Sequence, residues 1–111
     1  MRELEQKYLG ILEKLDWRVC DYYDDGRVDI EKYSPAGEEF IICVEVENLP
    51  QEVREYAANF DQDEHIEMWI EARRNGTSGV PSTRELVQDA ADIDEMLQEL
   101  ATALSRAKEA E

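Results

Sequence analysis

One predicted helix decides how the rest of the chain is arranged, and its sequence is DQDEHIEMWIEARR (Asp61–Arg74). The apolar residues Ile66, Trp69 and Ile70 repeat at i, i+3 and i+4, which predicts a stripe buried against the rest of the protein. Five of the other eleven positions are acidic. A stable helix does not require so many acids, so their number is the main functional signal in the sequence.

The negative charge is concentrated around this helix. The chain carries 28 acids and 12 bases, a formal net charge of −16. Residues 45–71 hold nine acids and one base, Arg54. Such a surface repels nucleic acid and attracts basic proteins. The residues that we predict to form a partner-binding acidic surface are Glu45, Glu47, Glu52, Glu55, Asp61, Asp63, Glu64, Glu67 and Glu71.

The pattern of the remaining chain predicts a single α+β domain, residues 1–111. We expect three helices to pack on one face of a three-stranded antiparallel meander that follows an N-terminal helix. No apolar run is long enough to span a membrane, and no signal region opens the chain, so we expect a cytoplasmic protein. The expected segments are a helix in 1–16, the sheet in 17–47, two acidic helices in 48–75 and a long helix in 82–108.

Alternating apolar residues fix the expected strand register. Two turn sequences separate predicted strands at residues 17–23, 27–33 and 38–46. Matching apolar with apolar positions sets Arg27 opposite Glu45, where we expect one ion pair. The apolar pairs that follow are Val28–Val44 and Ile30–Ile42.

The helices carry start signals and apolar stripes. Capping sequences are expected at Asn48 with Gln51, Asp61 with Glu64, and Ser82 with Glu85. The expected shared core consists of Trp17, Val28, Ile30, Phe40, Ile42, Val44, Val53, Tyr56, Phe60, Ile66, Trp69, Ile70, Leu86, Ile93 and Leu97.

Apolar residues of the last helix recur at spacings of four and three, which is a heptad pattern. One interpretation is a long helix laid across the domain. The other is a dimer seam, so that the protein is a monomer or a homodimer. The seam residues are Leu86, Ile93, Leu97, Leu100 and Leu104.

The sequence contains no pattern typical of a catalytic or metal site. His65 is the only histidine, and no second His or Cys stands at ligand spacing. Glu31 and Lys32 are adjacent in a predicted strand and point to opposite faces, which argues against a nuclease metal site. We interpret Cys20 and Cys43 as reduced sheet cysteines, with a disulfide as the less favoured alternative. We therefore expect no enzymatic activity, no metal and no cofactor.

Three segments, YAANFD (residues 56–61), EHIEMWIEAR (residues 64–73) and SGVPS (residues 78–82), resemble small acidic proteins of unassigned function from anaerobic gut bacteria and their phages and conjugative elements. The resemblance names no reaction and no catalytic residue. It implies a mobile-element setting, in which small acidic proteins act as antirestriction or anti-CRISPR inhibitors.

Two functions follow from the charge pattern and this resemblance. The first is an inhibitor that imitates DNA and blocks a basic, nucleic-acid-binding host defence protein, without binding nucleic acid or a membrane itself. The alternative is a non-enzymatic adaptor or dimeric scaffold. The arrangement of the acids distinguishes these two functions. If the acids form one exposed surface, the structure favours the first function.

Overall fold

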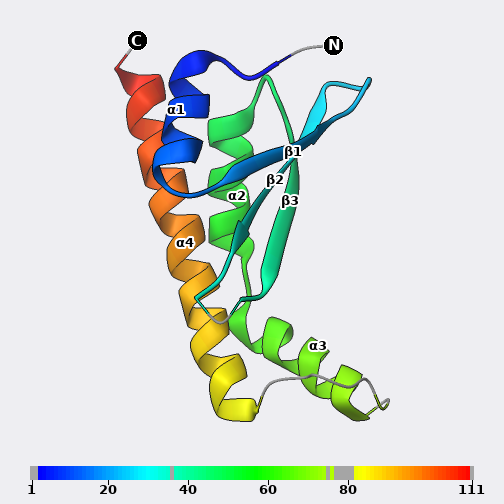
Figure 1. Ribbon diagram of the computed structural model, residues 1–111. Helices are drawn as coiled ribbons and strands as arrows, with labels where there is room; N and C mark the ends of the chain where they lie inside the picture. Colours follow the sequence, from blue (N-terminus) through cyan, green and yellow to red (C-terminus); the bar gives the residue numbers. More distant parts are fainter. Residues whose placement is uncertain (1–2, 36, 75, 77–81, 111) are drawn as a thin grey trace.

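The protein, described by a computed structural model, has the expected α+β fold: a helix, a three-stranded sheet and three further helices (Figure 1). The structure describes residues 3–35, 37–74, 76 and 82–110, and the side chains of Arg73 and Arg74 lie outside that description. The first helix is shorter than the predicted residues 1–16. The elements are α1 (Gln6–Lys14), β1 (Arg18–Tyr22), β2 (Arg27–Tyr33), β3 (Glu39–Glu45), α2 (Leu49–Asn59), α3 (Gln62–Arg74) and α4 (Thr83–Glu109).

The sheet is an antiparallel meander in the order β1-β2-β3. The predicted register between β2 and β3 is confirmed, with Arg27 opposite Glu45. Gly26 has a φ of +88°, a backbone conformation that favours glycine, and it forms the turn between β1 and β2. The apolar cross-strand pairs are Val28–Val44 and Ile30–Ile42.

The prediction of an ion pair between Arg27 and Glu45 is wrong, because these two described residues do not form an ion pair with each other. The Nη2 atom of Arg27 instead donates a hydrogen bond to the carbonyl oxygen of Cys43 at 3.0 Å. Glu45 accepts a hydrogen bond from the side chain of Asn48 at 2.8 Å. A long side chain reaches its diagonal neighbour as easily as the residue directly opposite, so the register alone did not fix this partner.

Helix α4 is the central element of the helical layer. It contacts α1, α2 and α3, and Figure 1 shows it running along the length of the molecule with α1 beside its C-terminal half. Its apolar stripe packs with the apolar face of the sheet and with α2 to form the core. None of the described helices, α4 included, is both long and apolar enough to cross a membrane.

The stripe on α4 is filled by the protein's own core. All five residues of the predicted dimer seam are at most 1% exposed. A dimer seam of this kind needs an apolar stripe at the surface, so the dimer-seam interpretation is wrong and the long-helix interpretation holds. The five buried residues are Leu86, Ile93, Leu97, Leu100 and Leu104.

Two of the three predicted helix caps are confirmed. The Oδ1 atom of Asp61 accepts a hydrogen bond from the backbone N–H of Glu64 at 3.1 Å. Ser82 Oγ accepts one from the N–H of Glu85 at 3.3 Å. Asn48 occupies the N-cap position of α2 as predicted, but its side chain makes no cap bond and is engaged with Glu45 outside the helix.

Helix α3 lies at the edge of the fold instead of in its core. It diverges from α2 and meets α4 near the start of that helix (Figure 1). Its predicted core residues Ile66, Trp69 and Ile70 are only half-buried and lie outside the main core cluster. Tyr56 of α2, another predicted core residue, is 41% exposed. The core prediction is therefore wrong for these four residues, since too few elements cover this end of the molecule.

Aromatic rings connect α3 to the body of the protein. The Phe40 and Phe60 rings meet edge to face with centroids 6.0 Å apart, and the His65 ring lies 5.6 Å from that of Phe60. The side chain of Gln62 adds a hydrogen bond of 2.8 Å to Asp94 on α4. These contacts hold α3 in place with little apolar burial, so its position depends on a few side chains.

Both cysteines are free thiols, as expected, so the disulfide alternative is wrong. Cys20 lies exposed on β1, whereas Cys43 is half-buried on β3. The strand β2 separates β1 from β3 in the sheet, which keeps the two sulfur atoms on strands that are not neighbours.

Candidate functional site

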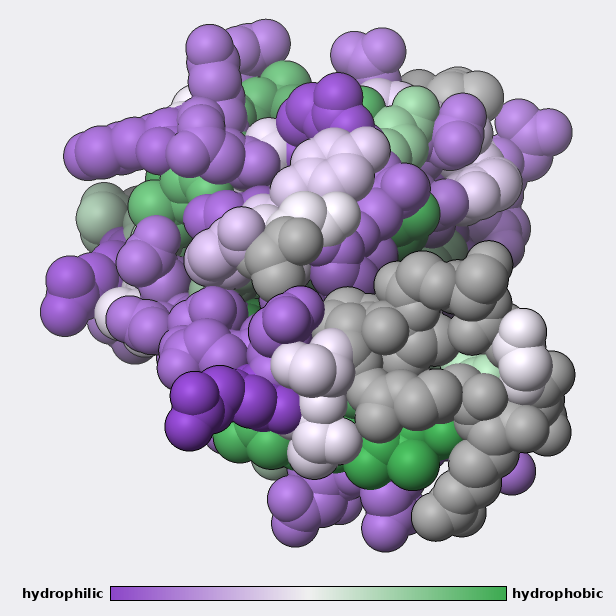
Figure 2. Space-filling model, turned by 60° about the horizontal axis from the view of Figure 1, so that its bottom comes forward, coloured by the Kyte–Doolittle hydropathy of each residue, from purple (hydrophilic) through white to green (hydrophobic). Residues whose placement is uncertain are grey.

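Five acids lie on α3 or at the residue that precedes it, and all of them are exposed. We call Asp61, Asp63, Glu64, Glu67 and Glu71 the acidic face of α3. Residues three and four apart are neighbours on a helix surface, so the successive carboxylates lie side by side. None of the five forms an ion pair with another described residue. Figure 2, which brings this end of the molecule forward, shows hydrophilic side chains beside apolar patches on the described surface.

The other predicted acids lie nearer the beginning of α2. Glu52 accepts a short hydrogen bond from the backbone N–H of Glu45, and Glu55 accepts one from Gln51 at 3.4 Å. Glu47 lines a separate hollow that also contains Lys108. The nine predicted acids therefore do not form one uniform patch.

Two neighbouring hollows connect part of this set. Glu52 and Glu55 line a shallow hollow together with Tyr56 and Asn59. Tyr56 and Asn59 also line a larger hollow, of about 600 Å³, which is lined by every acid of the acidic face except Asp63. The structure thus joins Glu52 and Glu55 to the acidic face of α3, while Glu47 remains apart.

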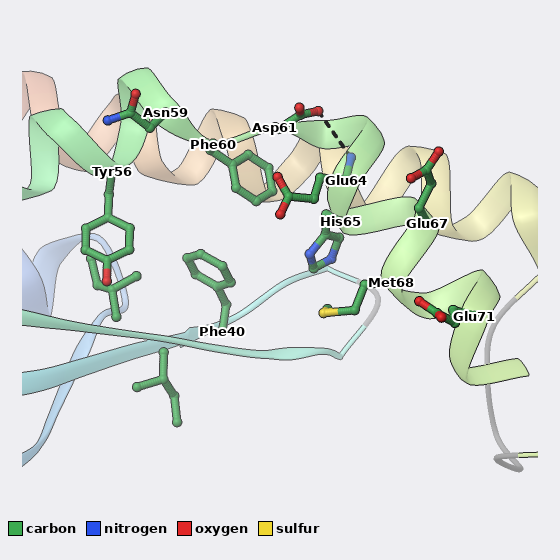
Figure 3. A pocket seen from close by; sticks show the side chains of 12 residues that line it. Phe40, Tyr56, Asn59, Phe60, Asp61, Glu64, His65, Glu67, Met68 and Glu71 are labelled. Carbon is green, nitrogen blue, oxygen red and sulfur yellow. Dashed lines mark hydrogen bonds between the residues drawn. The ribbon is translucent and has the colours of Figure 1, made fainter. Parts of the chain in front are cut away.

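The larger hollow has an apolar floor beside its acids. Figure 3 shows Phe40, Phe60 and Met68 facing the space between β3 and α3, and acidic side chains on the helix above. Met68 is 57% exposed and lines the hollow beside the acids. A hollow of this composition suits a protein ligand that has both apolar and basic side chains.

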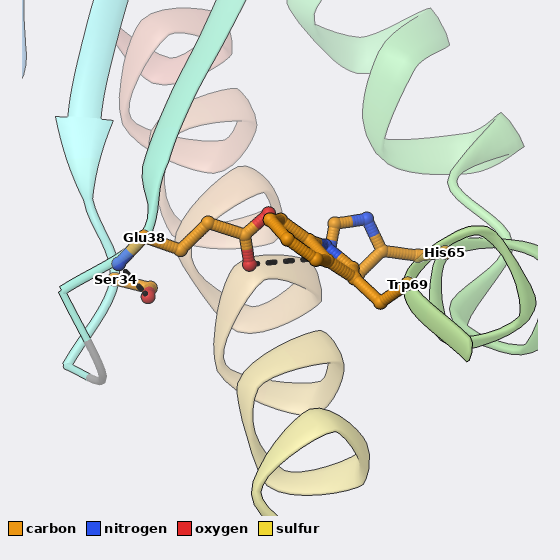
Figure 4. A network of polar contacts seen from close by, with 4 residues as sticks. All are labelled: Ser34, Glu38, His65 and Trp69. Atoms are coloured by element: carbon orange, nitrogen blue, oxygen red, sulfur yellow. Dashed lines mark hydrogen bonds and ion pairs between the residues drawn. The ribbon is translucent and has the colours of Figure 1, made fainter. Parts of the chain in front are cut away.

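A second group of polar side chains lies buried behind this hollow. Glu38 from the turn before β3, His65 from α3 and Asp89 from α4 each place a ligand-type atom within 4.8 Å of the other two. The distance between Glu38 Oε2 and His65 Nε2 is 3.3 Å. Trp69 Nε1 donates a hydrogen bond of 3.0 Å to Glu38 Oε1 (Figure 4). We call Glu38, His65 and Asp89 the buried cluster.

Burial changes the proton affinity of two members of the cluster. Burial, followed by the hydrogen bond and the charge of Asp89, raises the pKa of Glu38 to about 7. Burial lowers the pKa of His65, although the charge of Asp89 opposes that effect. His65 is therefore a neutral imidazole at pH 7, and its contact with Glu38 is a hydrogen bond and not an ion pair.

One signal for this cluster was visible in the sequence, although spacing arguments missed it. Asp89 lies three residues after Leu86 and four before Ile93, so an acid occupies the buried stripe of α4. A charged residue on such a stripe is rare unless it has a partner. Glu38 and Asp89 are 27 and 24 residues from His65 along the chain, too far for any ligand-spacing pattern to connect them.

A comparison of the chain with protein-family models, with curated proteins and with solved structures finds no match.

Proposed function

We propose that this protein is an acidic inhibitor that binds a basic, nucleic-acid-binding protein and imitates DNA. The observation that carries the proposal is the acidic face of α3, whose five carboxylates are exposed and form no ion pair with another described residue. Carboxylates in a row can take the place of phosphates in front of a groove lined by Lys and Arg. Following the resemblance, the target would be a host defence nuclease.

The arrangement of charge within α3 supports a binding role over a purely solubilising one. Asp63 and Glu67, and likewise Glu67 and Glu71, are like-charge neighbours four residues apart, which weakens the helix slightly. A helix that served only for solubility would gain from mixed signs. A basic partner reverses this repulsion on binding, so the cost in the free protein becomes a gain in the complex.

The apolar floor of the neighbouring hollow supports a protein as the ligand. Tyr56 and Met68 are exposed and line the hollow beside the acids. Protein interfaces combine apolar and aromatic contacts near their centre with charged groups at the rim. The target would therefore place an apolar side chain in the hollow while its basic residues meet the acids of α3.

Inhibition of DNA cleavage tests the proposal directly. We would add the protein to a panel of purified restriction and CRISPR nucleases and measure cleavage of a plasmid at low and high salt. For a nuclease that is inhibited, Glu64→Gln/Glu67→Gln/Glu71→Gln should weaken inhibition about tenfold and make it less sensitive to salt. The protein itself should not bind the plasmid.

A matched variant separates a specific surface from total charge. Glu95, Glu99 and Glu109 are exposed on α4, so Glu95→Gln/Glu99→Gln/Glu109→Gln removes the same charge elsewhere. This control should inhibit like the parent. The proposal fails if both triple variants weaken inhibition equally, or if no member of the panel is inhibited.

A further inference from the structure

We propose that Glu38, His65 and Asp89 form a binding site for one divalent transition-metal ion, with Zn²⁺ as the best fit. The three side chains come from the turn before β3, from α3 and from α4, so a bound ion would fasten the peripheral helix α3 to the rest of the fold. The inference goes beyond the proposed function and does not depend on it.

The first argument is the burial of negative charge. The side chains of His65 and Glu38 are 8% and 18% exposed, and Asp89 is 4% exposed. Two carboxyl groups that share a buried site repel each other when both are ionised. Within the described part of the chain, no Lys or Arg pairs with either of them. A divalent cation supplies the positive charge that this site needs.

The second argument is an unsatisfied oxygen. The Oδ1 atom of Asp89 is buried and has no hydrogen-bond partner among the described residues. Leaving such an acceptor unpaired destabilises the fold, so buried polar groups of this kind need an explanation. Asp89 also contributes the ligand-type atom that lies near His65 and Glu38. Coordination of a cation would satisfy the carboxylate.

The third argument is the geometry and chemistry of the donor atoms. Zn–N and Zn–O bonds are about 2.0–2.2 Å long, so two ligand atoms of a tetrahedral shell lie about 3.3–3.6 Å apart. The 3.3 Å between Glu38 Oε2 and His65 Nε2 already fits. The atoms of the whole set lie within 4.8 Å of one another, so the more distant pairs would have to approach by up to about 1.4 Å through side-chain rotation. One imidazole and two carboxylates suit Zn²⁺, with a water completing four-coordination.

A hydrogen bond around the cluster also fits a metal site. Trp69 Nε1 donates to Glu38 Oε1, which leaves Oε2 directed to His65 and fixes the orientation of the carboxylate. Outer partners of this type orient metal ligands, and their loss weakens metal binding about 10- to 100-fold. Trp69 is thus a positioning residue for Glu38 and not itself a ligand.

The chain contains a single histidine, so its imidazole nitrogens can be followed by NMR without ambiguity. We would treat the full chain with a chelator, remove the chelator and titrate it with Zn²⁺. One equivalent of Zn²⁺ should shift the His65 Nε2 resonance and raise the melting temperature. An unchanged Nε2 resonance at saturating Zn²⁺ would overturn the proposal, whatever the behaviour of any variant.

Variants then test the two carboxylates and the positioning residue by calorimetry with Zn²⁺. Asp89→Asn should weaken binding at least tenfold while leaving the metal-free protein as stable as the parent or more so, because it removes a buried charge. Trp69→Phe should weaken binding about 10- to 100-fold. If Asp89→Asn binds Zn²⁺ as tightly as the parent, the assignment of the ligands is wrong.

Exposed acids also attract zinc, so the acidic face of α3 supplies the control. Glu64→Gln/Glu67→Gln/Glu71→Gln leaves the buried cluster intact and should bind Zn²⁺ with the affinity of the parent. If this variant loses zinc binding while Asp89→Asn keeps it, the ion binds to the surface and the proposal fails. The same variant should lose inhibition of a target nuclease, so failure of the metal site and failure of the proposed function are distinguishable.

Discussion

Trp69 Nε1 donates a hydrogen bond to Glu38 Oε1 across 3.0 Å, and this contact joins α3 to the turn that precedes β3. The two residues lie 31 positions apart in the chain. Because Ile66, Trp69 and Ile70 are only half-buried, α3 gains little from apolar burial. Polar contacts of this type therefore contribute a large share of what holds the acidic face in place.

Replacing Trp69 by Phe tests that contribution. Trp69→Phe keeps an aromatic ring but removes the N–H donor, leaving Glu38 Oε1 without its partner. We expect the metal-free protein to lose about 1–2 kcal/mol of unfolding free energy, the usual cost of such a lost hydrogen bond. Urea denaturation measures this loss, and an unchanged midpoint would show that the bond does not stabilise α3.

Truncations in α4 and α3 should differ in their effects on stability. Leu97 is fully buried in the core, so Leu97→Ala should cost about 2–5 kcal/mol through lost burial and a cavity. Ile70 is half-buried at the edge of the fold, so Ile70→Ala should cost clearly less. Denaturation of the two variants under the same conditions compares them. Equal losses would mean that α3 belongs to the core after all.

The parts of the fold that depend on local pattern could be predicted from the sequence. A one-residue slip of β3 would turn Ile42 and Val44 away from the core, so alternation fixed the register with β2. The heptad spacing likewise identified the buried face of α4. Neither pattern states how much of a helix other elements cover, which is why the stripe Ile66, Trp69 and Ile70 was expected in the core.

Side-chain partners and the buried cluster could not be predicted in the same way. Arg27 was expected to pair with Glu45 and instead bonds to Cys43, because a long side chain has several neighbours within reach. Glu38, His65 and Asp89 meet only after three elements have packed together. The acidic face of α3, in contrast, follows from spacing on one helix, and its five residues are exposed as expected.

Two substitutions within the acidic face should change stability in opposite directions. Glu67 has like-charge neighbours on both sides, so Glu67→Gln should leave the protein equally stable or slightly more stable at low salt, with a difference that shrinks as salt rises. Asp61 caps the helix, so Asp61→Ala should cost about 0.5–2 kcal/mol. Thermal melts at two salt concentrations distinguish them, and stabilisation by Asp61→Ala would contradict the cap.

The metal-free protein should show a pH dependence that comes from Glu38. Burial and the neighbouring Asp89 raise the pKa of Glu38 to about 7 from an ordinary value of 4.5. A raised folded-state pKa means that folding favours the protonated carboxyl. The stability that Glu38 contributes is thus fully present below pH 4.5 and is lost as the pH rises through 7.

The variant Glu38→Gln isolates this effect, since an amide does not titrate and can still accept from Trp69. The lowered pKa of His65 acts in the opposite direction, because the stability that His65 contributes is lost as the pH falls. Both proteins contain His65, so this effect cancels when they are compared. Urea denaturation with a chelator present gives the unfolding free energy of each protein at each pH. The value for Glu38→Gln minus the value for the parent should increase between pH 4.5 and pH 8, with most of the change below about pH 7. A difference that stays constant over this range would mean that Glu38 titrates as an ordinary exposed carboxyl and that the cluster is not buried in solution.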